Sequence, residues 1–526
     1  MIDKNQYNQR TMLVILDGWG VAPANKGNAI ELAQKPFFDV LKKKYPYTEL
    51  CAHGERVGLP KGQPGNSEAG HLNLGAGRII HDDAVSINKS IKDGRFFKNP
   101  AFLEGVSHWK KYNSRIHLMG LVTEDNSAHS SPKHWFTMID FLKGQGVKEV
   151  FLHLFTDGRD SAQHAAIRIL ERFQDRTNNH NSLKVYIATI MGRFYAMDRV
   201  KKWENIEKAY NLLLYGQGFK VSSAQEGIVR AYNRKETDEF VSPTVIVNSE
   251  TKPISLIKDN DLVFFMNLRS DRARELSKAF VQKDFNKRNL QSFRRKKRLS
   301  NLFFIALTDF GPDLDNIRTA YPSQDVKKAL PIVLNGIKQV YIAETEKYAH
   351  ITFFFNGGYA ETVSNEKRII IPSPDISSYD LCPEMSADKI CQKICHEIKS
   401  YQPNFIALNF ANPDMVGHTG NLMATIKAVE CVDNNLKKLV HLAQKEKYSI
   451  IVTADHGNAE EMIDLKTGEI KTTHTTNPVP FILVSSDFKS AKLRSNGCLA
   501  DVSPTILYLL NREKPPEMTG QNLIRV

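Results

Sequence analysis

Short apolar runs alternate with stretches of helical spacing along nearly the whole chain. The run at 11–16 is apolar, rich in strand-favouring residues and stops at Asp17, which is typical of a buried parallel strand. The same pattern predicts strands at 115–122, 148–156, 183–191, 262–268, 301–307, 338–343, 350–356, 404–410, 448–453 and 479–485. Helical spacing predicts helices at 29–44, 133–143, 162–176, 200–215, 386–401 and 421–446. Strands that alternate with helices predict a doubly wound α/β architecture throughout.

Length and composition set the class of protein. A chain of 526 residues is too long for one core, so two domains are expected. With 41% hydrophobic and 25% charged residues it has the composition of a soluble globular protein. The N-terminal segment is polar, and the apolar run at 12–16 is too short for a signal or membrane segment. The six cysteines show no paired framework, so we expect free thiols, a cytoplasmic location and no membrane partner.

The net charge of +13 raises nucleic-acid binding as a hypothesis. Part of the excess is the run Arg-Arg-Lys-Lys-Arg at 294–298, which is usually a solvated face and which we expect to be dispensable for activity. Only this run offers anything like a contiguous basic face, whereas other arginines fall singly at strand ends. We therefore expect a small acidic substrate and no nucleic acid partner.

Acidic and histidine side chains gather where predicted strands end, which is where ligands bind in open α/β sheets. The set comprises Asp17, Asp414, His418, Asp455, His456 and His474. Any one of them could be a turn former, a helix cap or a core residue. Burying clustered carboxylates without cations would cost several kcal/mol each, so we expect two divalent metal ions. Aspartate and histidine ligands without cysteine favour Mn²⁺, with Zn²⁺, Co²⁺ or Mg²⁺ as alternatives.

A second set is cationic and follows the strands of the middle segment. It comprises Arg159 after 148–156, Arg193 and Arg199 after 183–191, and Arg269 and Arg272 after 262–268. One exposed arginine is usually a solubility charge, but several at the carboxyl ends of neighbouring strands form an anion clamp. They predict a substrate with two anionic groups and little apolar surface.

The stretch Lys-Gly-Gln-Pro-Gly-Asn-Ser-Glu-Ala-Gly-His at 61–71 places Ser67 after a glycine-rich turn. A helix is expected to begin there, with Ser67 at its cap position. A hydroxyl at that position faces backbone N–H groups and the positive end of the helix dipole, where a phosphate would sit. The alternative is an ordinary serine cap. Because nearby metal ions would lower the pKa of a coordinated hydroxyl, we expect Ser67 to act in phosphoryl transfer.

The stretch at 57–71 resembles the phosphoserine motif of cofactor-independent phosphoglycerate mutases. Five further runs are similar to that family's other signatures and occur in the same order. They are 157–160 (Asp-Gly-Arg-Asp), 192–199 (Gly-Arg-Phe-Tyr-Ala-Met-Asp-Arg), 343–350 (Ala-Glu-Thr-Glu-Lys-Tyr-Ala-His), 383–386 (Pro-Glu-Met-Ser) and 453–458 (Thr-Ala-Asp-His-Gly-Asn). The metal motifs alone are shared across the alkaline phosphatase superfamily, whereas 343–350 and the arginine loops are specific to the mutases.

The resemblance implies an alkaline-phosphatase-like metal-binding domain formed by 1–81 and 320–526, with an α/β substrate-binding and transferase domain inserted at 82–319. It implies that Asp414, His418 and His474 hold one metal ion, and that Asp17, Ser67, Asp455 and His456 hold the other. The residues that it assigns to the substrate are His129, Arg159, Asp160, Arg193, Arg199, Arg269, Arg272 and Lys347.

The activity that the resemblance implies is the interconversion of 3-phosphoglycerate and 2-phosphoglycerate in glycolysis and gluconeogenesis, by a monomer that forms a phosphoserine at Ser67. A metal-dependent phosphomonoesterase or another sugar-phosphate mutase of the same superfamily is the alternative. The chain departs from the family pattern at Pro64 and Ala69, where the family has methionine and valine. The loop at 123–129, which carries His129, is one residue longer than the family's form.

Overall fold

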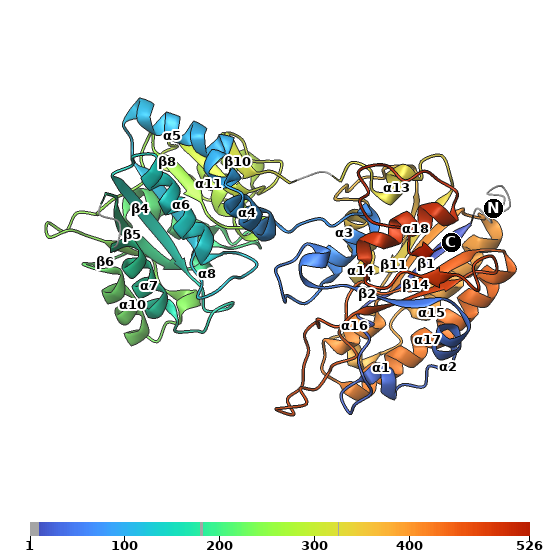
Figure 1. Ribbon diagram of the computed structural model, residues 1–526. Helices are drawn as coiled ribbons and strands as arrows, with labels where there is room; N and C mark the ends of the chain where they lie inside the picture. Colours follow the sequence, from blue (N-terminus) through green and yellow to red (C-terminus); the bar gives the residue numbers. More distant parts are fainter. Residues whose placement is uncertain (1–9, 179–181, 324–325, 526) are drawn as a thin grey trace. The chain divides into compact units, whose positions relative to one another are not determined.

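The computed structural model describes residues 10–178, 182–323 and 326–525 (Figure 1). The chain divides into two compact units: unit 1 consists of Met1–Asp82 with Gln324–Val526, and unit 2 of Asp83–Ser323. Unit 2 therefore begins at 83 and ends at 323, where the sequence suggested 82 and 319.

An eight-stranded sheet forms the centre of unit 1. Its order is β12 (Lys367–Ile371), β11 (Gln339–Glu344), β13 (Phe405–Phe410), β1 (Thr11–Leu16), β14 (Ser449–Thr453), β15 (Val479–Val484), β2 (Tyr47–Cys51) and β17 (Gly497–Cys498). The strand β1 pairs in parallel with β13 and β14, and all its residues are buried. The strand β15 runs antiparallel to both of its neighbours. The residues that precede β15 therefore lie at the edge where the parallel strands end.

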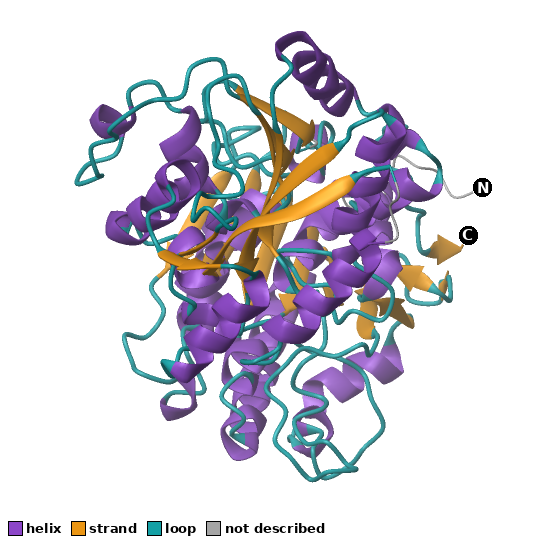
Figure 2. Ribbon diagram, turned by 90° about the vertical axis from the view of Figure 1, so that its left-hand side faces the viewer, coloured by secondary structure: helices purple, strands orange, loops and turns teal. Residues whose placement is uncertain are grey.

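Helices flank the strands of both units (Figure 2). Those of unit 1 are α1 (Ala29–Leu32), α2 (Pro36–Lys44), α3 (Ser67–Ala76), α13 (Leu330–Val333), α14 (Thr345–Ala349), α15 (Ala387–Ser400), α16 (Asn412–Gly417), α17 (Leu422–Lys445) and α18 (Val502–Leu509). In α17 the buried residues Val429, Val432, Leu436 and Leu439 recur at a spacing of three or four, which gives the helix one apolar face. That face packs into the main hydrophobic cluster of the unit.

Unit 2 contains a second eight-stranded sheet. Its order is β10 (Ile317–Tyr321), β9 (Phe303–Thr308), β8 (Leu262–Phe265), β3 (Ile116–Leu121), β4 (Glu149–Thr156), β5 (Lys184–Gly192), β7 (Thr244–Ile246) and β6 (Phe219–Val221). Pairing is parallel except between β5 and β7. Its helices are α4 (Asp83–Lys92), α5 (Pro100–Tyr112), α6 (Pro132–Gly144), α7 (Ala166–Asn178), α8 (Arg193–Ala196), α9 (Trp203–Tyr215), α10 (Ala224–Asn233), α11 (Arg274–Val281) and α12 (Phe285–Arg288).

Each face of the unit 2 sheet is buried under its own hydrophobic cluster. The neighbours Phe264 and Phe265 on β8 belong to different clusters, as do Leu118 and Met119 on β3. Successive side chains of a strand point to opposite faces, so both faces of this sheet are covered. This confirms the doubly wound α/β architecture expected from the sequence.

Two of the predicted elements are wrong in detail. The strand expected at 350–356 is instead a π-helical turn, His350–Phe354, which follows α14 and packs against α3. Its β-branched and aromatic residues favour a strand locally, but burial of Ile351 and Thr352 decides the conformation. The helix expected at 29–44 is split into α1 and α2, because Pro36 lacks a backbone N–H and disfavours helix in the residue before it.

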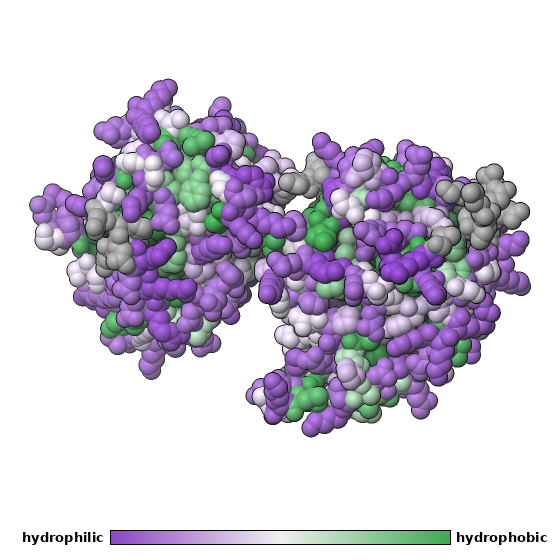
Figure 3. All heavy atoms as spheres, in the orientation of Figure 1, coloured by the Kyte–Doolittle hydropathy of each residue, from purple (hydrophilic) through white to green (hydrophobic). Residues whose placement is uncertain are grey.

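Hydrophilic side chains cover most of the surface that Figure 3 shows, and the hydrophobic ones lie in small scattered groups. In the described ranges, none of the helices combines the length and the apolar character that crossing a membrane requires.

Candidate active site

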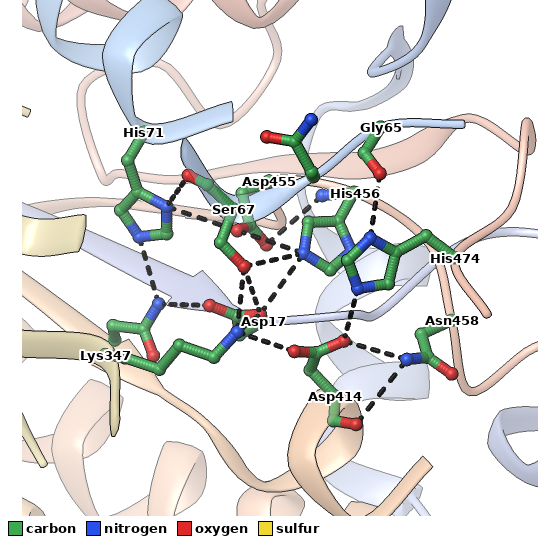
Figure 4. Close-up of polar contacts among 12 residues, drawn as sticks. Asp17, Gly65, Ser67, His71, Lys347, Asp414, Asp455, His456, Asn458 and His474 are labelled. Atoms are coloured by element: carbon green, nitrogen blue, oxygen red, sulfur yellow. Dashed lines mark hydrogen bonds and ion pairs between the residues drawn. The ribbon is translucent and has the colours of Figure 1, made fainter. Parts of the chain in front are cut away.

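Three acidic residues converge at the carboxyl edge of the unit 1 sheet. Asp17 directly follows β1, Asp455 follows β14, and Asp414 lies on α16, which follows β13. All three are buried, with exposed fractions of 0%, 0% and 1%. Figure 4 shows them pointing toward one another around Ser67 and Lys347.

Asp414, His418 and His474 form the first cluster of potential metal ligands. The Nε2 atoms of the two histidines lie 3.3 and 3.2 Å from Asp414 Oδ1 and 3.0 Å from each other. Their Nδ1 atoms lie 2.7 Å from the carbonyl oxygen of Thr472 and 2.9 Å from that of Gly65. A carbonyl only accepts hydrogen bonds, so in the neutral imidazoles both Nδ1 atoms carry the proton and both Nε2 atoms offer lone pairs. Two lone pairs and a carboxylate oxygen that face one another fit a cation.

Asp17, Asp455 and His456 form the second cluster. His456 Nε2 lies 3.5 Å from a carboxylate oxygen of each aspartate and 2.9 Å from the hydroxyl of Ser67. Ser67 Oγ also lies 3.5 Å from Asp17 Oδ1. Among the described residues, Asp455 Oδ2 accepts no hydrogen bond, although His71 Nδ1 is 3.2 Å away. The donor set of two carboxylates, an imidazole and a hydroxyl suits a divalent ion.

Lys347 lies between the two clusters. Its ammonium donates to Asp17 at 2.8 Å, to Asp414 at 2.6 Å and to Ser67 Oγ at 2.8 Å. Burial alone would lower the pKa of Lys347, but the two carboxylates raise it above its ordinary value. Burial and the neighbouring Asp455 raise the pKa of Asp17. One ammonium therefore does not neutralise three buried carboxylates, which supports the fit to metal ions.

Ser67 is the first residue of α3 rather than its cap. The cap is Asn66, whose side chain accepts a hydrogen bond of 2.8 Å from the backbone N–H of Ala69. The sequence prediction of Ser67 at the cap was wrong by one position, because asparagine caps a helix as well as serine does. Since the cap is supplied by Asn66, the buried hydroxyl of Ser67 is left to contact the two clusters.

Glycine at position 65 brings the turn before Ser67 against the sheet. A Cβ at Gly65 would lie 2.2 Å from the carbonyl oxygen of Ala52 and 2.9 Å from the Cβ of His456. Any side chain at this position would displace the turn or the histidine.

His71 and Asn409 support the clusters, and the sequence analysis gave neither a role. His71 Nδ1 lies 2.9 Å from the carbonyl oxygen of Ser67, and His71 Nε2 lies 3.0 Å from Asn409 Nδ2. Asn409 also donates to Asp17 at 2.7 Å. The four-residue spacing of Ser67 and His71 places both on one face of a helix and was the available signal. Nothing in the sequence marked Asn409, which lies inside the apolar strand β13.

In unit 2, Arg193 and Asp157 form a buried ion pair at the ends of β5 and β4. Arg193 Nη1 lies 2.5 Å from Asp157 Oδ1 and 3.3 Å from Asp160 Oδ2. Arg159, in the same loop as Asp160, donates to Glu239 at 2.6 Å. The Arg159 side chain remains about half exposed to solvent.

The other expected cations of unit 2 lie around Asp271. Its two carboxylate oxygens lie 3.0 Å from Arg199 Nη1 and 3.0 Å from Arg269 Nε. Arg272 donates to the carbonyl oxygen of Met197 at 3.2 Å. Burial, together with Arg193, Arg199 and Arg159, lowers the pKa of Arg272. Arginines held this close together repel one another, and a bound anion would relieve that repulsion.

His129 lies within electrostatic reach of this group despite its longer loop. Burial lowers the pKa of His129 to about 4, with Arg193 acting in the same direction and Asp160 and Asp271 opposing it. Its imidazole is therefore neutral near pH 7. Apart from Lys347, which belongs to unit 1, the residues expected to hold substrate all come from unit 2.

Comparison with known proteins shows strong similarity over the whole chain. Residues 9–514 match the model of the metalloenzyme superfamily. The chain is 46% identical to the 2,3-bisphosphoglycerate-independent phosphoglycerate mutase of Clostridium novyi, over 98% of this chain and 99% of that protein. It is also 46% identical to 2,3-bisphosphoglycerate-independent phosphoglycerate mutase 1 of Methanosarcina barkeri, over 100% of both chains. A crystal structure of Leishmania mexicana phosphoglycerate mutase at low cobalt concentration aligns with a TM-score of 0.70 and 30% identity, covering 99% of this chain and 98% of that one.

Proposed function

The chain belongs to the family of 2,3-bisphosphoglycerate-independent phosphoglycerate mutases, within the metalloenzyme superfamily, and we propose which of its residues carry out that family's isomerisation. It is a phosphoglycerate mutase whose substrate is a small phosphorylated acid. The observation that best supports the assignment of roles is the position of Ser67, whose hydroxyl contacts His456 and Lys347 beside two clusters of potential metal ligands.

We propose two divalent ions, one held by Asp414, His418 and His474, the other by Asp17, Ser67, Asp455 and His456. When bound, such ions lower the pKa of the hydroxyl and stabilise the oxygens of a phosphoryl group in transfer. Carboxylate and imidazole ligands without thiolates favour Mn²⁺ over softer ions.

In the proposed reaction, Ser67 Oγ attacks the phosphorus of 3-phosphoglycerate. The bond between phosphorus and the 3-oxygen of the glycerate breaks, and the proton lost by Ser67 passes to that oxygen. The 2-hydroxyl then attacks the phosphoserine, and its proton returns to Ser67 Oγ. Lys347, whose ammonium donates to Ser67 Oγ, favours the ionised oxygen and offsets charge on the phosphoryl group.

Between the two steps the glycerate must be retained and turned. We propose that the arginines of unit 2, with His129 and Asp160, bind its carboxylate and hydroxyls during this interval. The planar guanidinium of Arg272 and its neighbours suits a carboxylate, which it can bind through two parallel hydrogen bonds. Each unit thus has its own task, phosphoryl transfer in unit 1 and glycerate retention in unit 2.

Trapping of the intermediate tests this assignment. The protein is mixed with 3-phosphoglycerate without bisphosphoglycerate, quenched in acid, digested and examined for a phosphoryl group on the peptide that contains Ser67. We expect the modified peptide in the metal-loaded enzyme and none after chelation. Turnover without any modified peptide, or with the phosphoryl group on another residue, would contradict the proposal.

We further propose that the enzyme acts as a monomer in the cytoplasm, without a nucleic acid partner. All six cysteines are free thiols, which is typical of proteins in a reducing compartment. Sedimentation analysis of the metal-loaded enzyme measures the state directly, and a stable dimer would contradict a monomer.

A further inference from the structure

A polar cavity lies in unit 1, among residues that the proposed reaction does not use. It has a volume of about 240 Å³, and three arginines, Arg56, Arg494 and Arg525, contribute to its lining. The rest of the lining includes polar residues such as Ser495 and Asn496 together with the apolar Ile79 and Leu523. A cavity of this size takes a group as small as a phosphate.

The cavity carries an excess of positive charge. Within the described part of the chain, none of the three arginines forms an ion pair, and Arg56 donates to the carbonyl oxygen of Asn496 and also interacts with the thiol of Cys498. The one acidic residue in the lining is Asp501, whose two oxygens accept the backbone N–H groups of Cys498 at 2.8 Å and Gln521 at 2.7 Å. Both of its oxygens thus already accept hydrogen bonds, and the three guanidinium groups outnumber its single negative charge.

A strand pair beside the cavity adds to this excess. The strands β16 (Lys492–Leu493) and β18 (Ile524–Arg525) pair antiparallel, and Lys492 lies directly opposite Arg525. Like charges at directly opposite positions destabilise a strand pair. Arg494 directly follows β16, and its backbone N–H donates to the carbonyl oxygen of Leu523 at 2.8 Å, which keeps it beside β18. Lys492, Arg494 and Arg525 thus lie close together, and a bound anion would offset their repulsion.

We propose that this cavity binds a small phosphate-bearing anion, either inorganic phosphate or a phosphate monoester, at a site separate from the catalytic one. Guanidinium groups bind phosphate oxygens through paired, charge-assisted hydrogen bonds, and three of them can surround one phosphate. Neither cluster of potential metal ligands shares a residue with the cavity.

The position of the cavity connects it to the helix that begins at Ser67. Ile79 lines the cavity, and the backbone N–H of Gly520 donates to the carbonyl oxygen of Gly77, the residue that ends α3, at 2.9 Å. The ten residues of α3 separate this end from Ser67 by about 15 Å. An anion bound to Arg494 and Arg525 therefore stabilises the C-terminal segment 519–525 against the end of this helix.

Hydrogen exchange of backbone amides tests the proposal at the level of single segments. The metal-loaded enzyme is compared with and without millimolar inorganic phosphate, and a second series uses glycerol phosphate in its place. We expect exchange in 492–498 and 519–525 to slow several-fold with at least one of the two probes. Slowing with phosphate identifies the free ion as a ligand, and slowing with glycerol phosphate alone identifies a monoester.

The double variant Arg494→Gln, Arg525→Gln should lose this protection, because each guanidinium removed weakens phosphate binding about tenfold. The matched control is Arg512→Gln, an exposed arginine of unit 1 outside the cavity, which should keep it. Circular dichroism and the unfolding midpoint show whether the double variant is folded. If the double variant does not fold, Arg494→Lys is used in its place, because lysine keeps the charge but lacks the planar fork of arginine. Absence of slowing with both probes, or equal slowing in the cavity variants, would overturn the proposal. Because exchange is read without turnover, this result is independent of the proposed catalytic roles.

Discussion

The ammonium of Lys347 lies 2.8 Å from the hydroxyl of Ser67, although 280 positions separate the two residues in the chain. The same ammonium contacts the carboxylates of Asp17 and Asp414, and it is 3% exposed. A cation in this position holds together acids that would otherwise repel one another. It therefore has a role in the stability of the metal-free protein as well as a proposed role in transfer.

Replacing Lys347 with methionine should destabilise the metal-free protein by about 3–5 kcal/mol, because it leaves buried carboxylates without their partner. Urea denaturation after chelation measures this loss. Lys399→Met, at an exposed position of α15, should change the free energy of unfolding by no more than about 0.5 kcal/mol. Equal stability of the two variants would show that Lys347 does not balance these acids.

Replacing Ser67 with alanine should remove mutase turnover by a factor of about 10⁶, as loss of an activated nucleophile does. The protein should remain folded, because Asn66 and not Ser67 caps α3. Asn66→Ala is the matched variant, and it should lose about 1 kcal/mol of stability while keeping its nucleophile. Steady-state kinetics and thermal unfolding of both variants check this. Substantial activity in a folded Ser67→Ala protein rules out the phosphoserine.

Protons and metal ions should compete at His418. Its hydrogen bond to Asp414 raises the pKa of His418 above the ordinary value of 6.5. In the metal-free protein the protonated pair stabilises the fold fully below pH 6.5 and loses this effect as pH rises through the raised pKa. A metal ion needs the neutral imidazole, so its affinity should instead fall as pH decreases, by about tenfold per pH unit for one displaced proton.

Competition with a chelating dye between about pH 8.5 and about pH 6 measures this dependence. Activity lost in mildly acidic buffer should return in part with excess Mn²⁺. A metal affinity that does not change over this range would contradict the assignment of His418 as a ligand.

The grouping of Asp17, Asp414 and Asp455 could be expected from the sequence, because the carboxyl ends of parallel strands share one edge of a sheet. The position of His474 depends on β15, which runs antiparallel, and a short apolar run does not reveal the direction of a strand. Burial of Lys347 could not be derived from its neighbours in the chain, since only carboxylates from distant segments stabilise its charge. Only the family resemblance marked that residue.

The error at 350–356 has a similar origin. Its aromatic and β-branched residues favour a strand, and a run this short carries too little periodicity to distinguish strand from buried helix. The fold around it was predicted well because alternating strands and longer amphipathic helices repeat the same signal over many residues.

The basic run at 294–298 is not uniform in the structure. Arg295 is half-buried, and its guanidinium donates to the carbonyl oxygens of Ala279 at 2.9 Å and Gln282 at 2.8 Å. Because these carbonyls lie at the end of α11, Arg295 binds that end of the helix. The expectation of a fully solvated face was wrong at this residue. Arg295→Gln should lower the stability of unit 2 by about 1–3 kcal/mol, because it leaves those carbonyls without donors.

Arg294, which is exposed, provides the control within the same run. Arg294→Gln should leave stability and kcat/KM within a few-fold of the parent protein. Denaturation and kinetics distinguish the two positions. A large, salt-sensitive loss of kcat/KM in Arg294→Gln would point instead to electrostatic attraction of the substrate.

Arg272 allows isomerisation to be separated from hydrolysis. Hydrolysis needs only phosphoserine formation and a water, whereas isomerisation needs the glycerate to be retained. Because Arg272 lies among like charges that an anion would relieve, Arg272→Ala should reduce retention more than phosphoserine formation. With labelled 3-phosphoglycerate, the fraction of label that ends in free phosphate should rise relative to 2-phosphoglycerate, because water competes for the phosphoryl group. Arg168→Gln, an exposed arginine of unit 2 that pairs with Glu124, should leave this fraction unchanged. If Arg272→Ala loses both products in proportion, the arginine contributes only to initial binding and the retention role is wrong.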